Sequence, residues 1–249
     1  MRQETSLMSY RVIIPARLGS TRLPGKPLKD IYGKTLLQRV VEQANKSSTR
    51  SVHVATDSQA IIEHCNLHNI QAFLTNPNHK TGSDRLAESC SILDLKDDEL
   101  IVNVQGDEPF IDPEDINNLA SLALSKDANM ATLYSDLDEE DTVDENVVKL
   151  WVDSNSLVKE FSRDINYLQP KEAKKHIGLY GYKVKFLKSF VEWKQSYNET
   201  KRNLEQMRAM DNGINIFAIK SQGKYDLGVD TEADLLKAIK IAKELDESN

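Results

Sequence analysis

The chain has 249 residues, with 32 Lys and Arg against 39 Asp and Glu, and therefore a formal net charge of -7. An acidic chain without a basic tract is not suited to bind polymeric nucleic acid, and no run approaches the about 20 apolar residues that cross a bilayer. The two cysteines, Cys65 and Cys90, have no metal-type spacing, so we expect neither a disulfide scaffold nor a structural zinc site. Together these features predict a cytoplasmic protein without membrane insertion.

Strand-like runs alternate with amphipathic stretches in the first half of the chain. Predicted strands cover residues 10–14, 52–55, 71–74 and 100–104, and predicted helices cover residues 36–46, 59–68, 83–93 and 113–125. The last of these helices opens with Asp112 as its cap and Pro113 in its first turn. Such alternation predicts an α/β, Rossmann-like fold with a mostly parallel sheet, whose ligands bind at the edge where the strands end.

The alternation stops in the middle of the chain. Strand-like runs at residues 129–134, 147–152, 156–161 and 178–186 have few helical patterns between them, and polar residues 171–175 predict a solvated loop. We interpret residues from about 129 to 200 as a small antiparallel excursion within a single domain. A strand at 214–219 and a helix from Thr231 to about Glu244 end the chain, and residues 1–7, before Met8, are an expected disordered extension.

The loop at residues 15–28 combines glycines and prolines with three cations and two hydroxyls. Glycine lets backbone N–H groups approach phosphate oxygens, arginine binds them bidentately, and lysine adds a compact charge. The spacing matches neither a Walker loop nor a dinucleotide-binding glycine motif, and an ordinary basic loop is the alternative. The expected nucleotide-binding residues of this loop are Pro15, Ala16, Arg17, Ser20, Arg22 and Lys26.

This loop resembles the signature of the sugar nucleotidyltransferases, and most closely that of the 3-deoxy-manno-octulosonate cytidylyltransferase family of lipopolysaccharide assembly. The resemblance extends from about residue 10 to residue 235. It implies a homodimer that needs Mg²⁺ and couples CTP to an acidic octulosonate sugar. Other segments that match the family, in its order, are Ala55-Thr56-Asp57, Thr81-Gly82-Ser83-Asp84-Arg85, Gln105-Gly106-Asp107-Glu108-Pro109, Phe161-Ser162-Arg163, His176-Ile177-Gly178, Leu204-Glu205-Gln206 and Gly228-Val229-Asp230.

Two aspartates are candidate metal ligands. Asp107 follows a buried-type strand, and Asp230 precedes the last helix. Alone, each is more simply a turn or cap residue, whereas two carboxylates with triphosphate oxygens suit Mg²⁺. The resemblance implies that Asp107 and Asp230 hold this ion, and no catalytic role is assigned to Glu108.

The resemblance assigns further residues to the two substrates. Asp57 has a second interpretation, as the cap of the helix at 59–68. The implied catalytic residues are Arg17, Lys26, Gln105 and Asp107, in an in-line attack on the α-phosphorus that needs no protein nucleophile. The additional nucleotide-binding residues are Ala55, Thr56, Asp57, Ser83, Arg85 and Gln105.

The implied sugar-binding residues are Gln105, Arg163, His176, Tyr182, Glu205 and Gln206. Arg163 could bind the sugar carboxylate bidentately, and the others could hydrogen-bond to hydroxyls. The ordinary alternatives are a structural hydrogen bond for His176 and a solvated helix face for Glu205.

The chain departs from the family pattern at residues 164–168, at Arg202, where Glu is common, and at Tyr197, where Pro is frequent. These departures leave open the 8-amino-3,8-dideoxy form of the sugar. Two rival functions are a cytidylyltransferase for another acid sugar or a polyol phosphate, and a non-catalytic nucleotide-binding regulatory protein.

Overall fold

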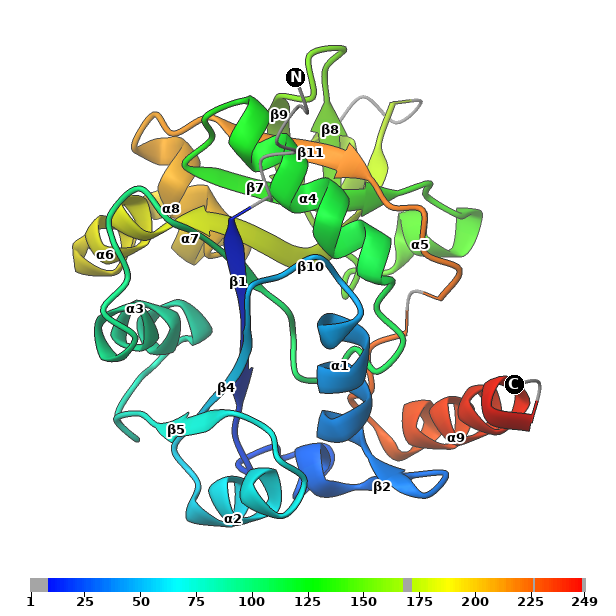
Figure 1. Ribbon diagram of the computed structural model, residues 1–249. Helices are drawn as coiled ribbons and strands as arrows, with labels where there is room; N and C mark the ends of the chain where they lie inside the picture. The colour runs from blue at the N-terminus through cyan, green and yellow to red at the C-terminus, as the bar shows by residue number, and fades with distance from the viewer. Residues whose placement is uncertain (1–8, 168–171, 226, 248–249) are drawn as a thin grey trace, which may run out of the picture.

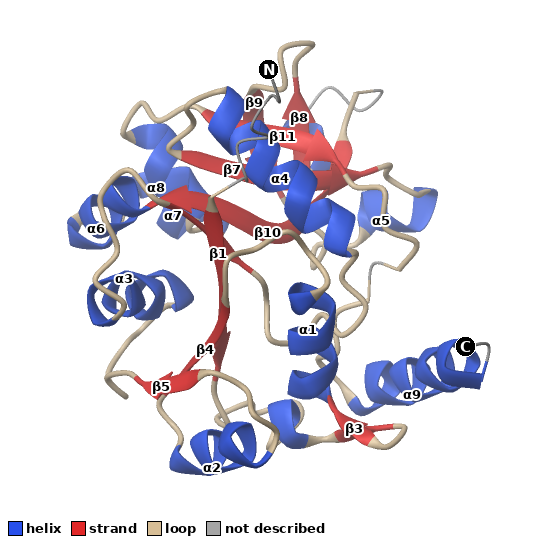
Figure 2. Ribbon diagram, viewed as in Figure 1, coloured by secondary structure: helices blue, strands red, loops and turns tan. Residues whose placement is uncertain are grey.

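Most strands of the described residues belong to one main sheet, seen nearly edge-on in Figures 1 and 2. The computed structural model describes residues 9–167, 172–225 and 227–247, so the predicted extension at 1–7 lies outside the described residues. Within those ranges the main path of the sheet has the order β11-β7-β10-β6-β1-β4-β5. These strands are β1 (Tyr10–Ala16), β4 (Val52–Thr56), β5 (Ala72–Leu74), β6 (Leu100–Asn103), β7 (Met130–Ser135), β10 (Lys174–Lys183) and β11 (Ile216–Lys220).

Along this main path four of the six pairings are parallel, which confirms the predicted α/β, Rossmann-like fold with a mostly parallel sheet. β1 pairs in parallel with β4 and β6, and β11 pairs in parallel with β7, whereas β10 runs antiparallel between β6 and β7. The antiparallel hairpin of β8 (Lys149–Val152) and β9 (Val158–Ser162) joins the sheet through β10. A separate two-stranded sheet consists of β2 (Asp30–Ile31) and β3 (Lys34–Thr35).

The predicted excursion at about 129–200 is smaller in the structure, because β7 and β10 belong to the main sheet and β8 and β9 lie off its path. β10 begins at Lys174, inside the predicted loop at 171–175, and α6 begins at Val184, inside the predicted strand at 178–186. A residue pattern indicates that a segment is extended, but the strands that it pairs with are decided by tertiary contacts.

Helices cover both faces of the sheet. One apolar core includes residues of α1, α2, α4 and α9, and the other includes residues of α3, α6 and α8 (Figure 1). No helix in the described part of the chain is long and apolar enough to span a membrane. The helices are α1 (Leu36–Asn45), α2 (Gln59–Leu67), α3 (Gly82–Ile92), α4 (Pro113–Ser125), α5 (Glu139–Val143), α6 (Val184–Glu192), α7 (Tyr197–Arg202), α8 (Gln206–Asp211) and α9 (Glu232–Glu247), with 3-10 turns at Lys26–Leu28 and Ile165–Tyr167.

Side-chain caps explain where several helices begin. Thr35 and Thr81 each accept a hydrogen bond from the backbone N–H three residues later, and each begins a reciprocal capping box. Asp112 caps α4 by accepting from Glu114 N, as predicted. Thr81 thereby fixes the start of α3, and residues around this start face the site described below.

A buried ion pair holds α7 against α8. Arg208 Nη2 and Nε donate to Glu199 Oε1 and Oε2 at 2.6 and 2.8 Å, and both side chains are 6% exposed. The guanidinium also lies 4.6 Å from the centre of the Phe190 ring. Burial alone would raise the pKa of Glu199, but the bonds from Arg208 outweigh it and lower that pKa. The pair fixes the orientation of α8, which follows directly on Glu205.

Removing one partner of this pair would leave the other charge buried. We expect Arg208→Met to lower the free energy of unfolding by about 3–5 kcal/mol, and Glu199→Gln with Arg208→Met to cost less than Arg208→Met alone. Urea unfolding measures both, with the exposed Lys201→Met on α7 as a control that should change stability by less than about 0.5 kcal/mol. Equal effects of Arg208→Met and Lys201→Met would show that the pair contributes nothing.

Candidate functional site

A cavity of about 460 Å³ opens where β1 and β6 end, at the edge of the sheet that the sequence predicted. This volume is typical of small-ligand sites. Four segments far apart in the chain contribute to the cavity: the loop after β1, the start of α3, the turn after β6 and the loop before α9. The lining residues are Pro15, Ala16, Arg17, Gly19, Ser20, Thr21, Arg22, Lys26, Pro27, His79, Thr81, Gly82, Arg85, Gln105, Gly106, Asp107 and Asp230.

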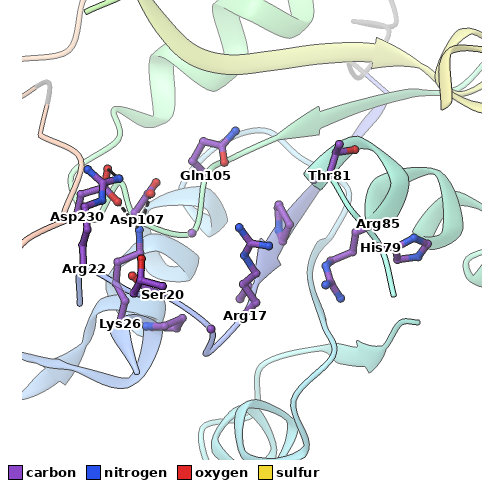
Figure 3. Close-up of a pocket in the computed structure, with 17 residues that line it drawn as sticks. Arg17, Ser20, Arg22, Lys26, His79, Thr81, Arg85, Gln105, Asp107 and Asp230 are labelled. Carbon is purple, nitrogen blue, oxygen red and sulfur yellow. Dashed lines mark hydrogen bonds and ion pairs between the residues drawn. The ribbon is translucent and has the colours of Figure 1, made fainter. Parts of the chain in front are cut away.

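Lys26 lies between the two predicted metal carboxylates. Its Nζ donates to Asp107 Oδ2 at 2.8 Å and to Asp230 Oδ1 at 3.0 Å, while Arg22 Nη2 is 3.0 Å from Asp230 Oδ2 (Figure 3). Burial alone would lower the pKa of Lys26, but Asp107 and then Asp230 outweigh it and raise that pKa. The ammonium is therefore charged at neutral pH.

Close backbone contacts bring these side chains together. A Cβ on Gly106 would lie 2.8 Å from Pro15 O, so only glycine lets the turn after β6 approach the end of β1 this closely. Val229 N donates to Asp107 O at 2.8 Å and holds the loop before α9 against that turn. Gly25, at φ 69°, turns the first loop into the 3-10 segment that carries Lys26.

The donor set fits a magnesium ion. The described residues contain no group of three or more His, Cys, Asp or Glu side chains that could hold a metal, and the cavity offers the two carboxylates of Asp107 and Asp230. Mg²⁺ in nucleotide enzymes is commonly held by one or two carboxylates together with substrate phosphates and water. The two aspartates already converge on one cation, Lys26 Nζ. Magnesium binding by this pair remains a prediction.

Arg85 lies at the other end of the cavity, beside His79 and Thr81 (Figure 3). Its Nη2 donates to Asp57 Oδ2 at 2.6 Å, and its Nη1 donates to Thr75 Oγ1. Asp57 does not cap α2, because the N-cap is Ser58 and it makes no side-chain cap bond. The structure therefore uses Asp57 to neutralise and orient Arg85.

Besides Asp57, three further predicted nucleotide contacts lie outside this lining. Ala55 and Thr56 are fully buried in β4, and the buried Ser83 donates from Oγ to Glu205 Oε2 at 2.8 Å. Ser83 thus connects the start of α3 to Glu205, on the predicted sugar side. Nucleotide contact by these three residues remains a prediction.

Gln105 lies between the two ends of the cavity, as Figure 3 shows. Its Nε2 donates to Gly178 O on β10 at 3.2 Å, so the end of β6 is connected to the strand that carries His176 and Tyr182. The place of Gln105 between nucleotide and sugar remains a prediction. Arg17 is exposed and, among the described residues, has no ion-pair partner.

Glu205 is half-buried and Gln206 is buried, and together they form a polar wall rather than a solvated helix face. Glu205 accepts from Ser83 and lies 3.4 Å from Arg208 Nη2. Burial is the largest influence on the pKa of Glu205 and raises it, although the bond from Ser83 and the charge of Arg208 act in the opposite direction. Such a carboxyl can hydrogen-bond to a sugar hydroxyl in either protonation state.

Tyr182 packs inside the protein, whereas His176 is only partly buried. Tyr182 is 4% exposed and stacks between Tyr180 and Phe186, which favours a packing role. His176 Nε2 lies 2.9 Å from Thr132 Oγ1, as its ordinary structural interpretation requires. Sugar contact by these residues remains a prediction.

Arg163 is not among the residues that line the nucleotide cavity. Its Nη1 donates to Glu145 O and Asn146 O at 3.1 and 3.0 Å, and it lines a separate hollow beside Asn203. The family-atypical Arg202 donates to Glu160 Oε1 and Phe161 O at 2.5 and 2.6 Å, and so connects α7 to β9. Binding of the sugar carboxylate by Arg163 stays a prediction, and the departing segment at 164–168 is described only to residue 167.

His79, Thr81 and Gly82 line the cavity, although none of them was among the predicted site residues. Tyr180 was not predicted either, and on β10 it lies opposite Asn103 of β6. Because β10 is antiparallel to β6, Tyr180 lies nearer than Tyr182 to the edge that carries the site. The family motif at Thr81-Gly82 could have indicated these two residues as part of the site, but nothing in the sequence around His79 indicates that it lines the cavity.

His176 is neutral in the folded protein, so the free energy of unfolding should fall as the solution becomes acidic. Burial lowers its pKa to about 3, so below its usual pKa of about 6.5 the unfolded chain binds a proton that the folded chain does not. Folding stability from this group is therefore lost as the pH falls from about 6.5 toward 3, by about 2 kcal/mol at pH 5. His176→Gln, an uncharged donor, should lose less stability than the unmodified protein between pH 7.5 and pH 5. Parallel losses in urea unfolding would contradict this prediction.

Comparisons with known proteins agree with this geometry. A cytidylyltransferase family model matches residues 11–216. A Pseudomonas fluorescens protein named 3-deoxy-manno-octulosonate cytidylyltransferase is 43% identical over 91% of this chain and 95% of its own length, and the Idiomarina loihiensis protein of that name is 40% identical over 94% and 99%.

Among solved structures, CMP:2-keto-3-deoxy-manno-octonic acid synthetase complexed with CTP superposes with a TM-score of 0.88 and 33% identity, covering 95% of this chain and 99% of that one. A putative Bacillus anthracis glucose-1-phosphate thymidylyltransferase, 15% identical with a TM-score of 0.70 over 94% and 96% of the two chains, shares the fold alone.

Proposed function

The chain belongs to the cytidylyltransferase family and is a nucleotidyltransferase, and from this premise we propose that it transfers CMP from CTP to 3-deoxy-D-manno-octulosonate for lipopolysaccharide biosynthesis. The observation that carries the proposal is the convergence of Lys26, Asp107 and Asp230 in a chain 40–43% identical to proteins named for this reaction. A non-catalytic binding protein would have no need to keep all three groups in contact.

The reaction is an in-line displacement at phosphorus. The C2 anomeric hydroxyl of the sugar attacks the α-phosphorus, the bond to the bridging oxygen breaks, pyrophosphate leaves, and the hydroxyl proton passes to solvent or to a nearby base. Arg17, Arg22 and Lys26 bind the triphosphate oxygens and stabilise the charge that they gain. Gln105 separates the two substrates and keeps the sugar hydroxyl in line.

Asp107 and Asp230 would hold Mg²⁺, which supplies positive charge to the triphosphate when bound. Both carboxylates currently accept from Lys26, so a metal ion at this pair would compete with Lys26 for their oxygens. Lys26 would then be available to the phosphates, which its position within the cavity lining allows.

The sugar would lie against Glu205 and Gln206, next to Gln105. We further propose a cytoplasmic homodimer. The family resemblance supports the dimer, and the absence of a membrane-spanning helix among the described residues is compatible with the location. Light scattering coupled to gel filtration measures the assembly state.

The central experiment measures pyrophosphate release with Mg²⁺ for a matrix of CTP, UTP, ATP and GTP against candidate acceptors. These are 3-deoxy-D-manno-octulosonate, its 8-amino-3,8-dideoxy analogue, another acid sugar and a polyol phosphate. We expect turnover with CTP and the first sugar. Turnover restricted to the 8-amino sugar would move the assignment to that substrate. CTP binding without product in a single turnover would support the regulatory alternative.

Asp107→Asn should lower turnover at least about 100-fold, because one charged ligand of the metal is lost. The Mg²⁺ concentration for half-maximal activity should rise as well. Asp136→Asn is the control, because Asp136 is an exposed carboxylate that also pairs with lysines but lies outside the cavity. Near-normal turnover of Asp107→Asn, with an unchanged melting temperature, would remove Asp107 from the metal site.

A further inference from the structure

His79 lies at the end of the cavity that is occupied by Arg85 and Thr81, away from Asp107 and Asp230 (Figure 3). It belongs to the segment between β5 and α3, and its side chain is 20% exposed. No role for it follows from the triphosphate or the metal, because those charges are bound at the opposite end. Its imidazole is therefore an unassigned polar group in the wall of the nucleotide cavity.

Glu88 on α3 holds the ring of His79 in one orientation. Glu88 Oε2 lies 2.6 Å from His79 Nε2 and also accepts from Asn76 N at 2.8 Å. Burial would raise the pKa of Glu88, but the Asn76 and His79 hydrogen bonds outweigh it and lower that pKa. An ionised carboxylate only accepts, so Nε2 must carry the proton. In neutral His79 the other nitrogen, Nδ1, is then a hydrogen-bond acceptor.

The cation at this end of the cavity is neutralised. Arg85 is paired with Asp57 at 2.6 Å, and neutral His79, which donates to Glu88, adds no charge to the lining. Toward the opposite end, Arg22 and Lys26 share two aspartates, whereas Arg17, between the two ends, has no ion-pair partner among the described residues (Figure 3). The end with Arg85 and His79 suits an uncharged aromatic base with polar edges, and the part of the cavity with the loop cations suits phosphates.

The two pyrimidine bases differ where an acceptor can distinguish them. Cytosine has an exocyclic amine that donates, whereas uracil has a carbonyl oxygen at the same position. We propose that His79 Nδ1 accepts from the cytosine amine and so makes the enzyme prefer CTP to UTP, with Glu88 as the residue that positions the ring. The uracil oxygen would face the Nδ1 lone pair and be repelled. This inference rests on the proposed use of CTP.

The test compares the equilibrium affinities of CTP and UTP, measured by calorimetry with Mg²⁺, for the full chain and its variants. His79→Ala should lower the ratio of CTP to UTP affinity about tenfold, the value of one hydrogen bond of about 1.4 kcal/mol. His79→Asn should restore most of the ratio, because its amide oxygen can replace Nδ1 as acceptor. His68→Ala is the matched control, since His68 is exposed and lies outside this cavity.

An unchanged ratio in His79→Ala would overturn the inference, and so would equal losses for CTP and UTP, which indicate a role in loop structure alone. If His79→Ala does not fold, His79→Leu decides, because leucine fills the space of the ring without an acceptor and should lose the preference for CTP. The proposed function is tested separately by turnover. A protein that binds CTP selectively but makes no CMP-sugar would contradict that function and leave the role of His79 standing.

Discussion

The ionic contact of Lys26 with Asp107 and Asp230 determines the layout of the site. It joins segments 81 and 204 residues apart along the chain. Two carboxylates this close to one point would repel each other without a cation between them, and a half-buried ammonium would lose charge without carboxylates. Each group therefore stabilises the others. The same arrangement suits catalysis, since the place where Lys26 now balances two negative charges is also where a divalent ion would be stabilised.

The antiparallel strand β10 connects this contact to the second substrate. It lies between β6 and β7, and Gln105 at the end of β6 donates to its backbone at Gly178. The hydrogen bond from Ser83 to Glu205 makes a second connection, from the start of α3 to the polar wall before α8. Nucleotide and sugar can thus be aligned by hydrogen-bonded, buried elements, which keep reacting groups positioned better than free loops do.

Sequence reasoning succeeded where a local pattern has a local cause. Asp112 caps its helix because side-chain and backbone groups two residues apart satisfy each other. The cations of the first loop line the cavity, because a loop that follows a central parallel strand lies at the ligand-binding edge. It did not anticipate that Asp57 pairs with Arg85, or that Arg163 donates to backbone carbonyls of a neighbouring turn. These partners are distant along the chain, and only the folded backbone brings them into contact.

The sequence by itself determined the fold class, the cationic loop at residues 15–28 and the identity of the two candidate metal ligands. Periodicity, glycine placement and family motifs are properties of short segments. Only the tertiary structure decided that β10 enters the main sheet, that Tyr180 lies nearer the site than Tyr182, and that Glu88 fixes the ring of His79. These outcomes depend on strand register and on hydrogen bonds between separate elements, and the free energy of packing the whole chain selects them.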